Sequence, residues 1–283
     1  MIKEVSVASP DTVMRGVILW GCALSCVAGP ARADDAVASG QPSVDDVQKL
    51  KQDPISGLKT VYLQNLDLPV GHGVADSFTV QPVWPFRIDD DLKLITYTII
   101  PFQSVPSIAP GIQSGGGMGN VLFNGYFTAA KPDGTFKWGI GPALQLPTRS
   151  NPVLGSSALA MGPAGLIYDV FGSLSGGLVV QNLWSVTGPA NDAVDLFSTQ
   201  YFITYNFPDN WYLATNATVT ADWRAPSGNR WTVPVGGGFG KTFQISGSDL
   251  FYSANVQGFY NAARPNGVGD WEAIVQFQII FGQ

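Results

Sequence analysis

A period-two alternation of apolar and polar residues restricts the possible folds of this chain more than any other feature. In the stretch WEAIVQFQIIF (271–281), Trp271, Val275 and Phe281 share one parity with other apolar residues, whereas Glu272 and Gln276 occupy the other. Successive side chains of a β-strand point to opposite faces of the sheet. The stretch therefore predicts a strand with one apolar and one mostly polar face.

Segments of this kind recur along the chain at intervals set by turn residues. We predict twelve strands, at 58–66, 75–86, 91–103, 117–130, 135–147, 159–170, 173–187, 194–207, 210–223, 229–242, 249–262 and 270–282. Charged residues make up only 13% of the chain, against about 25% in an average soluble domain. An even number of strands of about ten residues, low charge and no long apolar run beyond the N-terminus predict an antiparallel all-β transmembrane barrel over residues 58–283.

Aromatic residues lie near the predicted strand ends, where membrane barrels place their interfacial girdles. A soluble β-sandwich, the alternative fold, would favour aromatic residues in mid-strand core positions. The expected girdle residues are Trp84, Trp138, Trp184, Trp211, Trp223, Trp231, Trp271 and Phe281.

The connections alternate in length, as expected of a barrel with short turns at one rim and longer loops at the other. The short set comprises 87–90, 131–134, 171–173, 208–210 and 243–248, and the longer set comprises 103–117, 148–158, 188–193, 225–229 and 263–269. We assign the short turns to the periplasmic side. Prolines inside strands cannot donate to a ladder, so we expect a bulge, a ladder break or a shifted strand boundary at Pro82, Pro101, Pro142, Pro163 and Pro234.

The N-terminus has the pattern of a secretory signal peptide over residues 1–33. A polar lead with Lys3 and Arg15 precedes a short apolar core, and a small-x-small site ends at Ala33. Both cysteines of the chain, Cys22 and Cys26, fall inside this segment, so no disulfide is expected after cleavage. We expect export to the outer membrane of a Gram-negative bacterium.

Residues 34–57 are polar and read as a periplasmic N-terminal segment. Ser43 can cap a short helix that has Asp45 and Asp46 in its first turn and is ended by Pro54. We expect this segment to be a solvated leader.

Several longer motifs resemble those of the neuromedin-U-like outer-membrane proteins, also described as a meta-pathway phenol-degradation family. The motifs are WGIGPALQLPT (138–148), LGSSALAMGPAGLIY (154–168), LVVQNLWSVTG (178–188), NRWTVPVGGGFGK (229–241) and FYNAARPNG (259–267). The resemblance covers most of residues 54–283. It implies an outer-membrane β-barrel with a transport role, and it supplies no agreed catalytic or binding residues. The chain departs from the usual barrel-assembly signal, a C-terminal aromatic, because Gly282 and Gln283 follow Phe281.

The polar parity of the strands provides the candidate lumen residues, most of them neutral amides. They are Gln81, Thr96, Thr98, Lys137, Gln145, Gln181, Gln200, Asn216, Asn255, Gln257, Glu272, Gln276 and Gln278. Strongly ion-selective channels use rings of like charge, and no such ring is apparent. Glycines 236, 238 and 240 share the same parity, where they make room in the lumen or relieve twist.

No cofactor or metal site is expected from the sequence. The chain has one histidine, His72, in the loop segment GHG, and a histidine metal site needs companions. A Ser-His hydrolase in the outer membrane is a weaker alternative, because His72 has no strand position and no G-x-S-x-G context. The segment VGGGFGK is too short for a phosphate-binding loop, and a formal net charge of −6 argues against nucleic-acid binding.

These observations favour a non-enzymatic, porin-like barrel that binds or passes small solutes, hydrophobic or aromatic ones included. Twelve strands fall between side-chain-filled barrels of eight strands and water-filled porins. A plugged barrel that only binds a partner is therefore the main alternative. The expected partners are the lipid bilayer and, during biogenesis, the barrel-assembly machinery.

Overall fold

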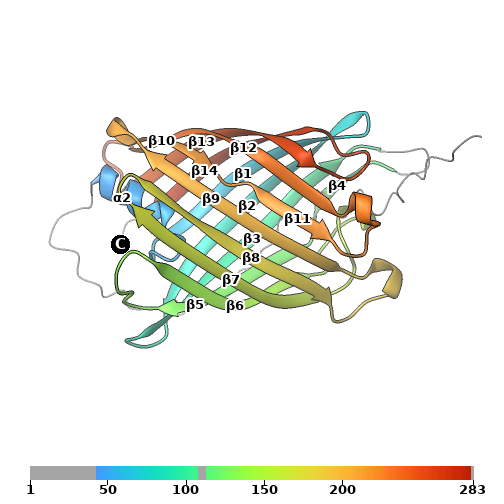
Figure 1. Ribbon diagram of the computed structural model, residues 1–283, viewed down its shortest axis with the longest axis horizontal. Coiled ribbons are helices and arrows are strands. Elements are labelled where there is room, and N and C mark those ends of the chain that lie inside the picture. Colours follow the sequence, from blue (N-terminus) through green and yellow to red (C-terminus); the bar gives the residue numbers. More distant parts are fainter. Residues whose placement is uncertain (1–42, 108–112, 282–283) are drawn as a thin grey trace, which may run out of the picture.

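The structure is a computed structural model that describes residues 43–107 and 113–281 of the chain. It confirms the predicted fold, a closed antiparallel barrel of twelve strands (Figure 1). The strands are β1 (Lys59–Val70), β2 (Gly73–Arg87), β3 (Leu92–Val105), β4 (Gly115–Met118), β5 (Val121–Ala129), β6 (Lys137–Leu146), β7 (Ala160–Phe171), β8 (Leu174–Ser185), β9 (Asp195–Asn206), β10 (Trp211–Thr215), β11 (Thr218–Asp222), β12 (Trp231–Gln244), β13 (Leu250–Ala263) and β14 (Trp271–Phe281).

Two barrel strands are interrupted, which explains why the sheet has fourteen elements. Both β4 and β5 pair with β3, and both β10 and β11 lie between β9 and β12. The barrel closes where β1 pairs with β14 in an antiparallel register that joins Lys59 to Phe281 and Asp67 to Ala273.

The first hairpin differs from the prediction. We expected strands at 58–66 and 75–86 separated by a loop, but β1 and β2 extend to a two-residue turn at Gly71 and His72. Gly71 has a φ of 59°, the left-handed region that glycine adopts readily. The strands continue because Leu68 and Val70 bury their side chains against Ala75 and Val268 on the inner face.

Each of the five strand prolines lies at an irregularity of the ladder, as expected. No cross-strand pair joins Pro82 to β3, Pro142 to β5 or Pro163 to β8. The register between β12 and β13 shifts at Pro234. Pro101 lies beside the gap between β4 and β5, where its carbonyl accepts a hydrogen bond from the amide of Gly119.

The outer face carries a broad apolar belt with aromatic residues toward both ends of the strands. Trp84, Trp138, Trp211 and Phe281 lie near the short turns, whereas Trp184, Trp223, Trp231 and Trp271 lie near the longer loops. Rings within each group approach one another: the centroids of Trp84 and Phe281 are 6.0 Å apart, and those of Trp223 and Trp231 are 5.6 Å apart. Mid-strand residues such as Val256 and Val275 are each 52% exposed on this face, a pattern that suits contact with lipid.

Among the described residues, one α-helix, α2 (Val44–Gln52), precedes the barrel and lies at the end of the strands where β14 finishes (Figure 1). Four short 3₁₀ helices occupy the connections, η1 (Pro152–Leu154), η2 (Ala190–Asp192), η3 (Pro208–Asn210) and η4 (Ser227–Asn229). Within the described ranges, no helix is both long enough and apolar enough to cross a membrane.

Candidate functional site

Helix α2 begins with the predicted capping box. The backbone amide of Asp46 donates to Oγ of Ser43, and the Asp46 carboxylate accepts from the backbone amide of Ser43. The helix ends at Gln52, two residues before Pro54. The expectation of a short capped helix in residues 34–57 is confirmed for its described part.

For residues 43–57, the expectation of a solvated leader is wrong, whereas residues 34–42 lie outside the described residues. Val47 and Gln48 of α2 are only 2% and 1% exposed. Val47 packs with Phe251 and Ile280, which point inward from β13 and β14, and with Leu58 at the start of the barrel. The apolar side of the helix therefore lies inside the barrel mouth at the short-turn end.

Polar contacts hold the helix to the barrel wall. Nε2 of Gln48 donates to Oδ1 of Asn206 on β9 at 2.8 Å, and Nε2 of Gln52 donates to the same atom at 2.6 Å. Oε1 of Gln52 accepts from Nδ2 of Asn206 at 3.0 Å and from Oγ of Ser175 on β8 at 2.9 Å.

The residues after the helix continue this attachment. Asp53 forms an ion pair with Lys137 at the start of β6, and its Oδ1 accepts from the backbone amide of Ile55 at 2.9 Å. Ile55 is 1% exposed and joins the largest apolar cluster of the interior. We call residues 44–58 the plug, because they occupy the barrel interior at one end.

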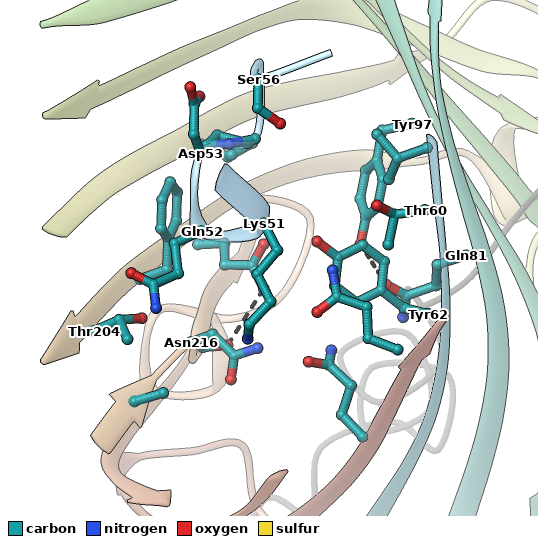
Figure 2. Close-up of a pocket in the computed structure, with 18 of the residues that line it drawn as sticks. Lys51, Gln52, Asp53, Ser56, Thr60, Tyr62, Gln81, Tyr97, Thr204 and Asn216 are labelled. Atoms are coloured by element: carbon teal, nitrogen blue, oxygen red, sulfur yellow. Dashed lines mark hydrogen bonds between the residues drawn. The ribbon is translucent and has the colours of Figure 1, made fainter. Parts of the chain in front are cut away.

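A cavity of about 170 Å³ lies between the plug and the barrel wall. Figure 2 shows Lys51 extending from the plug beside Asn216, with Tyr62, Tyr97 and Gln81 across the cavity. Most of the lining groups are amides, hydroxyls and tyrosines. Pockets for drug-sized ligands begin at roughly 300 Å³. The cavity is smaller than that, so it has room only for a smaller molecule.

Eleven of the predicted lumen residues face the barrel interior or the cavity. Those that line the cavity are Gln81, Gln200, Asn216, Asn255, Gln257, Gln276 and Gln278. Lys137 faces inward and pairs with Asp53 of the plug. Gln145, Gln181 and Glu272 are buried on the inner face away from the cavity.

The prediction for Thr96 and Thr98 is wrong, because both lie on the outer parity of β3. Thr96 is opposite Trp84 and Thr98 is opposite Phe123, whereas Tyr97 is opposite Asn124 on the inner face. The segment LITYTII offers no clear polar face, since threonine hydroxyls can be satisfied locally. Oγ1 of Thr96 donates to the Trp84 carbonyl at 3.1 Å, which allows a lipid-facing position.

The sequence reasoning missed several cavity residues, among them Lys51, Tyr62, Gln64 and Tyr97. Tyr62 and Gln64 share a parity in the first strand, where this pattern could have identified them. The inward position of Tyr97 follows from the correction of β3. No local signal places Lys51, because its position depends on the docking of the plug.

Lys51 is the one lysine or arginine that lines the cavity within the described part of the chain. Its Nζ donates to Oγ of Ser253 at 3.0 Å and lies 4.0 Å from the centroid of the Tyr212 ring. Burial between the helix and the wall lowers the pKa of the Lys51 ammonium to about 7.

Glycine on β12 makes room for this arrangement. A Cβ on Gly240 would lie 2.4 Å from the ring of Tyr212, so the ring rests directly on the glycine. A Cβ on Gly236 or Gly238 would instead meet backbone atoms of β13 at 2.1 Å and 1.8 Å. The expected role of making room in the lumen therefore applies to Gly240, whose Cβ would also meet the Ala254 carbonyl at 2.6 Å, and the other two permit close strand approach.

His72 is exposed at the tip of the first hairpin, as expected for a loop histidine. Across residues 43–107 and 113–281, no cluster of three or more histidine, cysteine or acidic side chains could hold a metal ion.

No protein-family model and no curated protein matches the sequence. Among solved structures, the chain is similar to an outer-membrane channel from Pseudomonas putida F1, with a TM-score of 0.58 and 13% identity over 80% of this chain and 96% of that one. The NanC porin gives a TM-score of 0.48 and 10% identity over 78% of this chain and 98% of the porin. The outer-membrane phospholipase of Salmonella typhi gives 0.42 and 11%, over 86% and 98%. The first similarity shows that the chain has the fold of bacterial outer-membrane β-barrels, and the other two are too weak to bear on function.

Proposed function

We propose that this protein is a bacterial outer-membrane channel that binds and passes small solutes, with its lumen controlled by the plug. The observation that carries the proposal is the polar cavity inside a barrel whose outer face is apolar. Inner-facing amides exchange hydrogen bonds with water or solute, whereas an inert structural barrel could fill its centre with apolar side chains. Channel function requires no catalytic group.

The contacts of the plug suit a reversible closure. Neutral hydrogen bonds contribute about 0.5–1.5 kcal/mol each in net terms, because water replaces them on release. The plug is held by amide pairs at Asn206, by one ion pair at Lys137, by a small apolar cluster at Phe251 and by Ile55 in the largest apolar cluster. In this mechanism the plug shifts, and solute moves between the cavity and the short-turn end.

The experiment is to fix the plug to the wall and to measure conductance in planar bilayers. A Gln48→Cys/Asn206→Cys double variant, produced from residue 34 onward so that Cys22 and Cys26 are absent, is joined with a reductant-cleavable bis-maleimide. We expect the joined protein to show no channel openings and the reductant to restore them. The matched controls are the two single-cysteine variants treated with the same reagent, which should conduct as before.

A joined double variant that conducts like the untreated protein would exclude the plug as the gate. The channel would be excluded if neither the wild-type protein nor a variant lacking residues 43–57 conducted ions. Both proteins would also have to fail to swell liposomes with any small solute. That second result would favour the alternative of a structural or partner-binding barrel. The buried position of Val47 and Gln48 is the observation that favours this alternative.

We also propose that the protein is not an enzyme. The hydrolase alternative requires a histidine next to a nucleophilic serine, and His72 lies at an exposed hairpin tip. Ester hydrolysis by the pure protein that is lost in His72→Ala would overturn this proposal.

Location and family are part of the same proposal. We propose export through the signal peptide of residues 1–33, insertion by the barrel-assembly machinery, and membership of the neuromedin-U-like family. The motifs that carry the resemblance fall on β6, β7, β8, β12 and β13. Fractionation of cells that produce the full chain tests the location. The structure of a family member tests the proposed family membership. We expect that structure to have prolines at ladder breaks in the positions that correspond to Pro142, Pro163 and Pro234.

A further inference from the structure

The cavity is lined by a partly buried cation, Lys51, which has no carboxylate partner among the described residues. The partners of Lys51 are the Ser253 hydroxyl at 3.0 Å and the face of the Tyr212 ring at 4.0 Å, and both are neutral. The other lysines attached to the plug differ in this respect. Lys49 pairs with Asp45 at 2.5 Å, and Lys137 of the wall pairs with Asp53.

A chain of side-chain amides fixes the orientation of one free donor in the same cavity. The backbone amide of Asn216 donates to Oε1 of Gln257 at 3.2 Å, so the amide group of Gln257 has one allowed orientation. Nε2 of Gln257 donates to Oδ1 of Asn255 at 2.8 Å, and Nδ2 of Asn255 donates to Oε1 of Gln276 at 2.9 Å. Nε2 of Gln276 donates to Oε1 of Gln64 at 2.9 Å.

The chain ends on Nε2 of Gln64, which has no hydrogen-bond partner although Gln64 is only 2% exposed. A backbone amide can only donate, so reversing one side-chain amide would bring two donors or two acceptors together along the chain. The free group at Gln64 is therefore a donor, and a buried donor without an acceptor is destabilising.

The register places these groups on one stretch of wall. Ser253, which accepts from Lys51, is directly opposite Gln278 on β14, and Gln278 is directly opposite Tyr62 on β1. Gln64 lies two residues from Tyr62 on the same face of β1. Side chains directly opposite one another in antiparallel strands have Cβ atoms about 4.5–5.5 Å apart. Lys51 and the donor of Gln64 thus border the same cavity, with Gln64 on the side of Tyr62.

We propose that the cavity is a binding site for a small organic anion, whose carboxylate pairs with Lys51 and whose body packs against Tyr62 and Tyr97. A cation partly removed from water favours a counter-ion, and the amide of Gln64 is a further hydrogen-bond donor beside the cavity. The two tyrosines line the opposite side of the cavity (Figure 2). The volume of about 170 Å³ suits a small ligand, and the single lysine among the described lining residues suits a monocarboxylate.

This inference rests on the proposed function, because it names the class of solute that the channel would take. Its test nevertheless measures equilibrium binding in detergent micelles, which needs neither an open pore nor a membrane. If benzoate does not bind but the protein conducts normally, only the proposed class of solute is overturned. If benzoate binds but the protein does not conduct, the binding site stands and the proposed channel function is overturned.

The probes are benzoate and its neutral isostere benzamide, titrated by calorimetry at pH 6 into the purified barrel. We expect saturable binding of benzoate and at least about tenfold weaker binding of benzamide, since a charge-assisted contact contributes about 1.5–3 kcal/mol. Lys51→Met should weaken benzoate binding by a similar factor and leave benzamide binding unchanged. The matched control is Lys49→Met, an exposed lysine on the same helix, which should bind benzoate as the wild type does.

Equal affinities of the wild type for benzoate and benzamide would overturn the proposal, as would undiminished benzoate binding by Lys51→Met. The wild-type comparison stands by itself if Lys51→Met does not refold.

Discussion

The side-chain amide of Gln48, on the helix that precedes the barrel, donates a 2.8 Å hydrogen bond to Oδ1 of Asn206 at the far end of β9. The two residues are 158 positions apart in the chain. Their contact shows that the N-terminal segment belongs to the interior of the barrel. The proposed gate, the cavity and the solute site all depend on this docking.

The ion pair between Asp53 and Lys137 leads to the first prediction. Asp53→Ala leaves the part-buried ammonium of Lys137 without a partner, which is costly where water has limited access. We expect the plug to release more often and its cleavage by an added protease to accelerate. Asp45→Ala, which removes the exposed pair with Lys49 on the same helix, should leave the cleavage rate unchanged.

The second prediction concerns the pH dependence of plug docking. Burial lowers the pKa of Lys51 from its ordinary 10.5 to about 7, so between these values the released plug binds more protons than the docked plug. Docking must therefore strengthen as the pH rises from about 7 toward 10 and stay constant below 7. Tyr62, Tyr97, Tyr126 and Tyr212 are the titratable wall side chains that line the cavity, and tyrosine hydroxyls ordinarily titrate near pH 10. Asp53 of the plug also lines it and pairs with Lys137.

Conductance at pH 6 and pH 9 measures this effect, with more frequent openings expected at pH 6. Lys51→Met should remove the difference. An unchanged pH dependence in that variant would show that another group is responsible.

The third prediction concerns the glycine beneath Tyr212. Gly240→Val would place carbon atoms where the ring now lies, since even a Cβ would be 2.4 Å from it. We expect the ring to move into the cavity, and the affinity for small solutes and the melting temperature both to fall. Gly258→Val on the neighbouring strand meets nothing within 4 Å, so it should behave like the wild type in the same thermal and binding measurements.

The fourth prediction tests the lipid-facing belt. Val256 lies in the middle of β13 and is 52% exposed on the outer face, so Val256→Lys would place a charge in the hydrocarbon layer. We expect the free energy of unfolding in bilayers to fall by about 2–4 kcal/mol. Ala263→Lys at the end of the same strand should cost about 0–1 kcal/mol. Equal effects at the two sites would contradict the proposed membrane position.

Sequence alone was sufficient for the architecture of the barrel. Period-two alternation is a local property, because each residue's face follows from its neighbours along the strand. Glu272, Gln276 and Gln278 were therefore placed correctly on the inner face, and the strand prolines were expected at ladder irregularities. The alternation failed at Thr96 and Thr98, where both parities of β3 are largely apolar and the pairing with β2 and β5 decides the face.

Only the tertiary structure decided what fills the barrel. The capping box at Ser43 predicted a helix, but local signals cannot distinguish a helix in water from one inside a polar lumen, because amides satisfy its polar side chains equally well. The burial of Val47, the contacts of Gln48 and the unpaired charge of Lys51 arise from pairings between the first sixty residues and strands more than a hundred residues later. Such long-range docking leaves no periodic pattern in the sequence. The sequence alone therefore determined the barrel wall, whereas the position of the plug and the cavity became apparent only from the tertiary structure.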